Sequence, residues 1–257
     1  MRAGDFLAAA ERLPVTDLAA LTGGRGLVVV APHPDDESLG CGGLIAGACR
    51  QGLPVRLVVV SDGTGSHPNS RAYPPDALRA LREDETRAAA ASLGLAAGHI
   101  RFLRLPDRAV PATGPAAEDA ARAVAEAARD CGAGTLFVTW EHDPHGDHRA
   151  SAAIVALARA RLPGIRVRAY PVWAWALPPG AEVGPAPSGM RLDVAADLPA
   201  KARAVAAHRS QTTALIDDDP EGFRLEPAML ARFARPFEIF LEVHPEAHPG
   251  VRSGMRS

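Results

Sequence analysis

The sequence predicts an α/β protein whose mostly parallel sheet is flanked by helices. Apolar runs rich in β-branched residues alternate with alanine-rich stretches, and each strand and helix together have about the length of a parallel crossover unit. The chain has 257 residues, of which 47% are hydrophobic and 23% are charged, and this fits one large domain. We therefore expect a single domain with one central sheet.

Four strand and helix units fill the first two thirds of the chain. A short apolar run between turn residues predicts a buried strand, and a longer alanine-rich stretch predicts a helix. Strands are expected at residues 26–31, 55–61, 100–105 and 135–140. Helices are expected at residues 39–51, 75–93, 115–131 and 149–161.

The final third is less regular and predicts a smaller strand and helix extension of the same domain. The expected elements are a strand at 167–175, a proline- and glycine-rich connection at 178–189, a helix at 199–208 and a strand at 237–243. We expect the domain to span residues 1–245 and residues 246–257 to form a flexible tail.

The composition argues against several classes of partner. A net charge of −2 gives no basic surface for nucleic acid or an anionic membrane. The three cysteines include no Cys-x-x-Cys pair, which favours a reducing compartment over a disulfide framework or a thiolate zinc site. No segment approaches the ~18 uncharged apolar residues of a membrane span, and the N-terminus, with its early Asp5, is a poor signal peptide. We expect a cytoplasmic protein, and a homo-oligomer is compatible with this composition.

The strongest chemical signal lies where the first predicted strand ends. The apolar run 27–31 is followed by the motif His33-Pro34-Asp35-Asp36-Glu37. A second motif, His142-Asp143-Pro144-His145-Gly146-Asp147-His148, follows the fourth predicted strand. Because the carboxyl ends of parallel strands meet at one edge of a sheet, the two motifs are predicted to converge.

The residue types in these motifs suit a catalytic metal, which takes three protein ligands and keeps a fourth position for water. His33, Asp36 and one histidine of the second motif can supply that set. Asp35 is then left beside the metal-bound water as general base. Histidines 145 and 148 are three residues apart, so one can bind the metal while the other faces the substrate, with Asp147 holding the tautomer of His145.

Plainer explanations exist for some of these residues. Asp35, Asp36 and Glu37 alone suit the acidic first turn of a helix, where carboxylates offset the helix dipole. A solvent-facing loop position is favoured for His142. Because histidines follow two separate strands, the metal site is the preferred interpretation, and Glu37 is then expected to support the turn.

Together the motifs resemble the PIG-L/LmbE-like zinc-dependent N-deacetylases, whose signatures are His-Pro-Asp-Asp-Glu after a strand and a later His-x-Asp-His. The similarity extends over most of residues 26–211. Weaker matches lie at Ser61-Asp62-Gly63, Arg82-Glu83-Asp84-Glu85, Leu93-Gly94, Leu105-Pro106-Asp107 and Ala207-His208-Arg209-Ser210-Gln211.

The resemblance implies a Rossmann-like fold and hydrolysis of an N-acyl group, most often N-acetyl, from an amino sugar or glycosyl conjugate. It implies a zinc ion held by His33, Asp36 and His148. It also implies Asp35 as general base, and His145, oriented by Asp147, as general acid or oxyanion stabiliser.

Two further residues are implied as contacts to substrate hydroxyls, Arg82 and Asp107. A helix-surface arginine and a turn-forming aspartate are equally weighted explanations for them. The chain departs from several relatives, which carry a tyrosine before the His-x-Asp-His box where Asp143 and Pro144 stand here. Whether His142 takes the part of that tyrosine is left open.

Two other functions compete with this prediction. The run Gly40-Cys41-Gly42-Gly43 suits a nucleotide- or S-adenosylmethionine-binding transferase, but its spacing is not Gly-x-Gly-x-x-Gly and the preceding acids would repel a phosphate. The second competing function is that of a metal-binding homologue that acts on a non-sugar amide or no longer catalyses a reaction. Specificity is expected in the loops 63–75, 107–114 and 173–189. Trp173 and Trp175 there either stack on a sugar or share the buried face of a strand.

Overall fold

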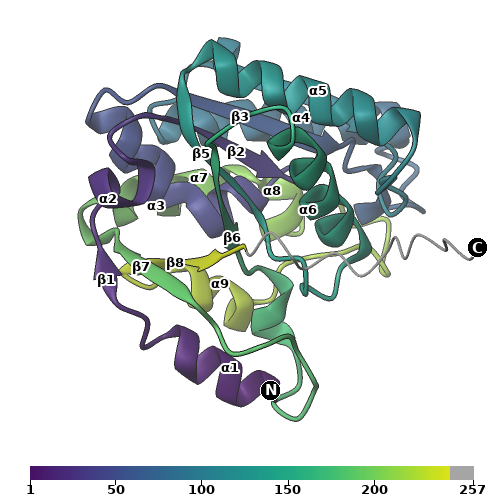
Figure 1. The fold of residues 1–257 in the computed structure, drawn as a ribbon. Helices are drawn as coiled ribbons and strands as arrows, with labels where there is room; N and C mark the ends of the chain where they lie inside the picture. The colour runs from purple at the N-terminus through teal and green to yellow at the C-terminus, as the bar shows by residue number, and fades with distance from the viewer. Residues whose placement is uncertain (244–257) are drawn as a thin grey trace, which may run out of the picture.

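The structure is a computed structural model, and it describes residues 1–243. Within these residues an eight-stranded sheet is covered by helices on both faces (Figure 1). The strands are β1 (Val15–Thr16), β2 (Gly26–Ala31), β3 (Val55–Ser61), β4 (Ile100–Leu105), β5 (Ala133–Thr139), β6 (Arg166–Tyr170), β7 (Gly189–Asp193) and β8 (Phe237–Glu242). The α-helices are α1 (Ala3–Ala10), α2 (Leu18–Thr22), α3 (Asp36–Arg50), α4 (Pro75–Ser92), α5 (Pro115–Asp130), α6 (Gly146–Arg159), α7 (Leu198–Ala207), α8 (Arg209–Thr212) and α9 (Pro227–Phe233). The predicted α/β fold is confirmed, and the predicted tail, 246–257, lies outside the described residues.

The strand order places the two motifs at the centre of the sheet. The order is β1-β7-β8-β6-β5-β2-β3-β4, and every pair is parallel except the two that β8 makes. From β2 the chain winds outward through β3 and β4, then returns to the other side of β2 as β5 and β6. The direction of winding therefore reverses between β2 and β5, which is where open α/β sheets bind ligands.

Strand β2 forms the buried centre of the sheet. All six of its residues are buried, and their side chains alternate between two hydrophobic clusters. Leu27 and Val29 pack in the cluster that includes α3, whereas Val28 and Val30 pack in the cluster that includes α5 and α6. Each such side chain contributes about 1.5–3 kcal/mol when fully buried. Figure 1 shows α5 and α6 together on their face of the sheet.

The predicted strand at 167–175 is wrong in its second half. Strand β6 ends at Tyr170, and a short 3₁₀-helix, Trp173–Ala176, follows. The turn is fixed by Pro171, which has no N–H to donate, and by the Asp143 carboxylate, which accepts hydrogen bonds from the N–H groups of Val172 and Trp173. The chain is thereby redirected over the carboxyl edge of the sheet.

Several short elements were not predicted, namely α1, β1, α2, β7, α8 and α9. They are held by packing rather than by a long periodic pattern. Helix α1, for example, is bonded through its backbone to residues 179 and 181. Its Phe6 stacks on Trp140 with ring centroids 4.4 Å apart. Figure 1 shows α1 at the lower edge of the molecule, near the N-terminus. None of the helices in residues 1–243 is long and apolar enough to span a membrane.

Candidate active site

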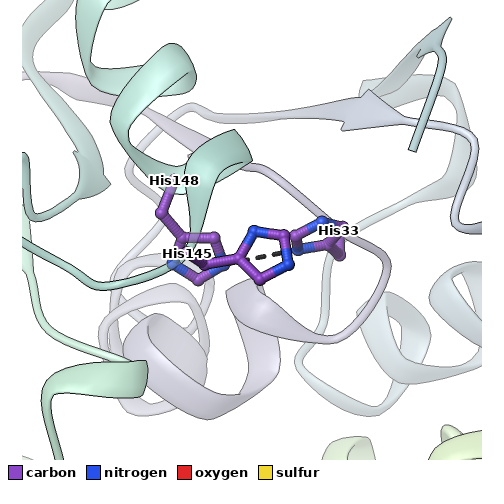
Figure 2. Close-up of side chains that lie close together, drawn as sticks. All are labelled: His33, His145 and His148. Carbon is purple, nitrogen blue, oxygen red and sulfur yellow. Dashed lines mark hydrogen bonds between the residues drawn. The ribbon is translucent and has the colours of Figure 1, made fainter. Parts of the chain in front are cut away.

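The predicted convergence of the two motifs is confirmed. Strands β2 and β5 pair in parallel, with Val30 opposite Val138, so the loops that follow them leave the sheet at the same edge. Figure 2 shows the imidazoles of His33, His145 and His148 gathered at that edge. The ring centroid of His33 lies 4.7 Å from that of His145 and 5.3 Å from that of His148.

A tight turn carries the first motif from β2 into α3. Asp35, the residue before the helix, has a φ of 144°, a conformation that costs a non-glycine residue about 1–3 kcal/mol. The Glu37 carboxylate holds the turn because it accepts the N–H of Asp35 at 3.0 Å. The same carboxylate lies 2.9 Å from Nε2 of the buried His208. This strained turn places adjacent carboxylates, Asp35 and Asp36, at the edge of the sheet.

Three donor atoms from the two motifs form a nearly equilateral triangle. His33 Nδ1 lies 3.2 Å from Asp36 Oδ2 and 3.3 Å from His148 Nε2, and the last two atoms lie 3.2 Å apart. In a tetrahedral zinc site with metal–ligand distances of about 2.0–2.1 Å, two ligand atoms lie roughly 3.3–3.4 Å apart. The donor types and their spacing therefore fit a small tetrahedral cation.

The second nitrogen of each of these two histidines faces a buried carboxylate. His33 Nε2 lies 3.2 Å from Asp107 Oδ1 and 3.2 Å from Asp147 Oδ2. His148 Nδ1 lies 3.6 Å from Asp143 Oδ2, and both residues are fully buried. Carboxylates in this position fix the tautomer and the ring orientation of a metal-binding histidine.

Without a metal, the carboxylates favour protons on these rings. Burial opposes the charge on His148, but Asp36 and Asp143 outweigh it and raise its pKa to about 9. Burial likewise opposes the charge on His33, yet Asp107, Asp147 and Asp36 raise its pKa. A cation that binds here has to displace protons.

Two other donor groups that can hold a metal share His33. One consists of His33, His145 and His148, and the other of His33, Asp107 and Asp147. The second group lies on the Nε2 side of the His33 ring, opposite the donor triangle. The two sides of this one ring thus offer distinct positions for a cation.

Asp35 lies outside the donor triangle but lines the same cavity. It is 6% exposed, and its Oδ2 lies 3.2 Å from Nη2 of Arg82. Burial raises the pKa of this carboxyl group to about 7, against the opposing effect of Arg82. A carboxyl group with a pKa near neutrality suits proton transfer at physiological pH.

His145 is the residue that caps helix α6. Its Nδ1 accepts the N–H of Asp147 at 3.2 Å, which leaves the ring proton on Nε2. Burial lowers the pKa of His145, and the neighbouring His33 and His148 lower it further. The lowered pKa favours the neutral ring, and within residues 1–243 no hydrogen-bond partner of its Nε2 is found.

Asp147 holds the tautomer of His145 through its backbone N–H and not, as expected, through its carboxylate. Its carboxylate instead faces His33 and accepts the N–H groups of Arg108 at 2.7 Å and Val110 at 3.1 Å. The helical start at residue 146 turns the Asp147 side chain toward the loop after β4, and only its backbone N–H reaches His145. Asp147 thus fixes His33 and this loop.

A cavity of about 180 Å³ lies over these residues. We call its polar base, made of His33, Asp35, Asp36 and His145, the cavity floor. We call its apolar side the cavity wall, which consists of Leu39, Val172, Trp173, Phe223 and Leu225. The remaining lining residues are Gly65, Ser66, Arg82, Asp107, Arg108 and Gln211.

The predicted substrate contacts Arg82 and Asp107 both line this cavity. Arg82 is 3% exposed and not a helix-surface arginine, and it donates to the backbone oxygens of Gly63 and Pro34. Asp107 accepts the N–H of Gly65 at 2.8 Å and also contacts His33. These contacts are to other parts of the protein, so a role in binding substrate hydroxyls stays a prediction.

The sequence left open the roles of Trp173, Trp175 and His142, and these three side chains lie in different places. Trp173 lines the cavity, with its ring centroid 6.3 Å from that of His145. Trp175 is buried and donates from Nε1 to the Pro171 oxygen, so the 3₁₀-helix points the two tryptophans in different directions. His142 packs on Trp140 and is not among the residues that line the cavity.

Sequence reasoning assigned no role to two buried residues of the site. The Asp143 carboxylate lies beside His148 and also accepts the backbone N–H of Trp173 in the cavity wall. In the sequence, only its position among the histidines of the second motif pointed to the site. Gln211 lines the cavity with its buried Oε1 unpartnered within the described residues. The weak match at 207–211 marked that segment without giving a reason.

The glycines after β2 do not form a phosphate-binding loop. They lie inside α3, where a Cβ on Gly40 would come within 2.2 Å of the Tyr170 ring and one on Gly43 within 2.5 Å of Val194. These glycines allow α3 to pack closely on its neighbours. The observation removes the basis for the nucleotide-binding alternative.

Comparison with protein families agrees with this geometry. The family model described as PIG-L, GlcNAc-PI de-N-acetylase, matches residues 28–159, just over half of the chain. The chain belongs to the PIG-L family. Members of the PIG-L family that are de-N-acetylases are hydrolases of an amide C–N bond, which is the enzyme class that the motifs predicted.

Individual relatives are consistent with PIG-L membership. The chain is 27% identical over 192 residues to a probable N-acetyl-alpha-D-glucosaminyl L-malate deacetylase 2 of Bacillus anthracis, covering 73% of this chain and 81% of the relative. Its fold matches the N,N′-diacetylchitobiose deacetylase of Pyrococcus horikoshii with a TM-score of 0.62 and 22% identity, over 84% and 82% of the two chains. It also matches the conserved protein TT1542 of Thermus thermophilus with a TM-score of 0.61 and 25% identity, over 89% and 100%.

Proposed function

We propose that this PIG-L protein is a zinc-dependent hydrolase that removes an N-acyl group, preferentially N-acetyl, from an amino sugar or glycosyl conjugate. The observation that carries the proposal is the donor triangle of His33, Asp36 and His148 with the Asp35 carboxylate beside it. The triangle has the donor types and the spacing of a catalytic zinc site.

Zinc is the cation that the donor set favours. Two imidazoles and one carboxylate match the open His/His/Asp-type sites of zinc hydrolases, which keep a position for water or substrate. When bound there, zinc supplies Lewis acidity to the acyl carbonyl and lowers the pKa of a water molecule. The carboxylates of Asp143 and Asp147 keep the two imidazoles in the orientation that this requires.

Asp35 moves the proton. With a pKa near neutrality, its carboxylate takes a proton from the attacking water and can return it to the departing amine. Arg82 keeps this carboxylate in place through its contacts with the Pro34 oxygen and with Asp35 itself. The strained turn at Asp35 is thus explained by the need to aim one carboxylate past its metal-binding neighbour.

His145 stabilises the charge that develops on the acyl oxygen. Its neutral ring keeps the proton on Nε2, so it acts as a hydrogen-bond donor rather than as the acid. Of the two roles that the family resemblance implies for this histidine, the geometry supports the oxyanion stabiliser. The backbone N–H of Asp147 fixes the tautomer, and its carboxylate does not take part.

Relatives and cavity size support the substrate class. The names of two relatives state that they act on N-acetylglucosaminyl malate and on diacetylchitobiose, both of which carry N-acetylated sugars. A cavity of about 180 Å³ is small for a whole disaccharide. We infer that it takes the acyl group and the amino sugar, with the rest of the substrate outside.

A screen for amine release tests the proposal. Zinc-loaded protein is incubated with N-acetylated amino sugars and their glycosides, with and without a chelator, and free amine and acetate are measured. We expect equal amounts of both products, and their loss when zinc is removed. Zinc-loaded protein that releases neither product from any N-acetylated sugar contradicts the proposal.

A further inference from the structure

The cavity is lined by two arginines whose charges are used differently. The guanidinium of Arg82 is buried and bonded to Gly63, Pro34 and Asp35. The guanidinium of Arg108 is exposed, and within residues 1–243 no hydrogen bond or ion pair of this group is found. Arg108 therefore presents an uncommitted positive charge at the cavity.

The backbone at Arg108 is held in an unfavourable conformation. Its φ is 64°, in the left-handed region, which costs an ordinary residue roughly 1–2 kcal/mol relative to a right-handed one. The N–H of Arg108 donates to Asp147 Oδ2 at 2.7 Å, so the carboxylate that contacts His33 also fixes this residue. The backbone of Arg108 is thereby tied to Asp147, which contacts His33 of the cavity floor.

Gly65 clears the path of the Arg108 side chain. A Cβ at position 65 would lie 2.9 Å from Nε and 3.0 Å from Cγ of Arg108, closer than atoms of side chains pack. The N–H of Gly65 also donates to Asp107 at 2.8 Å, which holds the two loops together. The arginine stem thus runs across the backbone of Gly65 at the cavity.

The other charges at the cavity determine what Arg108 can bind. The lining includes the carboxylates Asp35, Asp36 and Asp107, which disfavour an anion on the cavity floor. The charge of Arg82 is already paired with Asp35. An anionic group of the substrate is therefore best accommodated beside Arg108, away from the scissile amide.

We propose that Arg108 is a specificity residue that binds an anionic group, a carboxylate or a phosphate, on the part of the substrate beyond the amino sugar. This inference rests on the proposed deacetylase function. The guanidinium offers a planar fork of donors that matches the oxygens of either anion. The substrate class is then an acidic N-acetylated glycoside rather than a neutral one.

The test compares three N-acetylglucosaminides that differ in one group, which is neutral, a carboxylate or a phosphate. The value of kcat/KM is measured for the wild-type protein and for Arg108→Gly, in which glycine accepts the left-handed backbone. Arg104→Gly is the matched control. Arg104 has a φ of 56°, but its guanidinium is bonded to Glu83 at 2.6 and 3.0 Å and does not line the cavity.

We expect the wild-type protein to prefer an anionic glycoside. Arg108→Gly should lower kcat/KM for that glycoside about tenfold more than for the neutral one, and Arg104→Gly should leave the ratio unchanged. The preference should weaken as salt is added, because the guanidinium is exposed. If Arg108→Gly lowers kcat/KM for only one of the two anionic glycosides, that result shows whether Arg108 selects a carboxylate or a phosphate.

Equal losses for neutral and anionic glycosides in Arg108→Gly, or an unchanged ratio, would overturn the inference. Binding of the same three glycosides, measured by calorimetry, makes this comparison without turnover. If no glycoside is hydrolysed, the proposed function fails. The binding ratio in Arg108→Gly still decides whether Arg108 selects an anion.

Discussion

The cavity floor and the cavity wall are built on different principles. Two polar groups of the floor are held by distant segments of the chain: His33 by Asp107 and Asp147, and Asp35 by Arg82. The wall gathers apolar side chains from α3, the turn after β6 and the segment at 223–225. The chemistry is thus fixed by the centre of the sheet, whereas the surroundings of the substrate depend on later loops that can change independently.

Loss of a floor ligand should have the largest effect. Asp36→Asn removes the one carboxylate of the donor triangle, so we expect zinc to be lost and kcat to fall roughly 10³-fold or more. Zinc content by elemental analysis and amine release measure this. Asp76→Asn, at a carboxylate whose side chain is 88% exposed, is the control and should change neither. One retained zinc with native turnover in Asp36→Asn would remove this residue from the ligand set.

Removal of the proton carrier should reduce turnover while the zinc stays. Asp35→Asn keeps the size of the side chain but cannot accept a proton, and we expect kcat to fall about 10²–10⁴-fold. Its zinc content and KM should stay near those of the wild-type protein. The general-base role is excluded if turnover remains near native in protein shown to retain zinc.

A smaller effect is expected from the carboxylate behind His148. Asp143→Asn keeps an oxygen for the N–H groups of Val172 and Trp173 but weakens the support of His148, so zinc affinity should fall about 10–100-fold. Competition with a chelator of known affinity measures this. Glu141→Gln, in the same loop, is the control. Unchanged zinc affinity in Asp143→Asn would show that Asp143 supports only the wall.

Zinc affinity should also depend on pH through His148. Because its pKa is raised to about 9 in the metal-free protein, the ring is protonated below that pH and zinc has to displace the proton. We therefore expect zinc affinity to rise as the pH rises from 6 toward 9, with proton release near pH 7.5. Calorimetry in buffers with different heats of ionisation measures the number of protons. Binding heats that are identical in all buffers would contradict this.

The smallest catalytic effect should come from the wall. Trp173→Ala removes an aromatic face next to His145, so KM should rise roughly three- to tenfold while zinc stays bound. Trp175→Ala should instead lower the free energy of unfolding by about 3–5 kcal/mol, because that ring is in the core. Thermal or urea unfolding separates the two. If both variants changed KM alike, the distinction between the two tryptophans would fail.

The centre of the sheet could be predicted from the sequence alone. Strands such as β2 are continuous apolar runs, and the rule that parallel strands end at one edge predicted that His33 and His148 would meet. This convergence depends only on the order of strands and helices along the chain. The support of the turn by Glu37 was likewise predicted, and the carboxylate accepts the N–H of Asp35.

Roles that depend on the direction of one side chain could not be predicted. Asp147 points to His33 because of the way α6 begins, and the tryptophans separate because Pro171 and Asp143 end β6 early. The burial of Arg82 depends on backbone oxygens of two other loops, which leave no pattern in the sequence. Short elements such as β1 and α2 lack a periodic signal and are held by their neighbours.

The position of the bound zinc tests the central claim most directly. A crystal structure of the zinc-loaded protein, with anomalous data at the zinc edge, locates the ion without reference to activity. We expect one strong peak bounded by His33 Nδ1, Asp36 Oδ2 and His148 Nε2, with Asp35 close by and unbound. A peak on the other side of the His33 ring, between Asp107 and Asp147, would contradict the proposed ligand set.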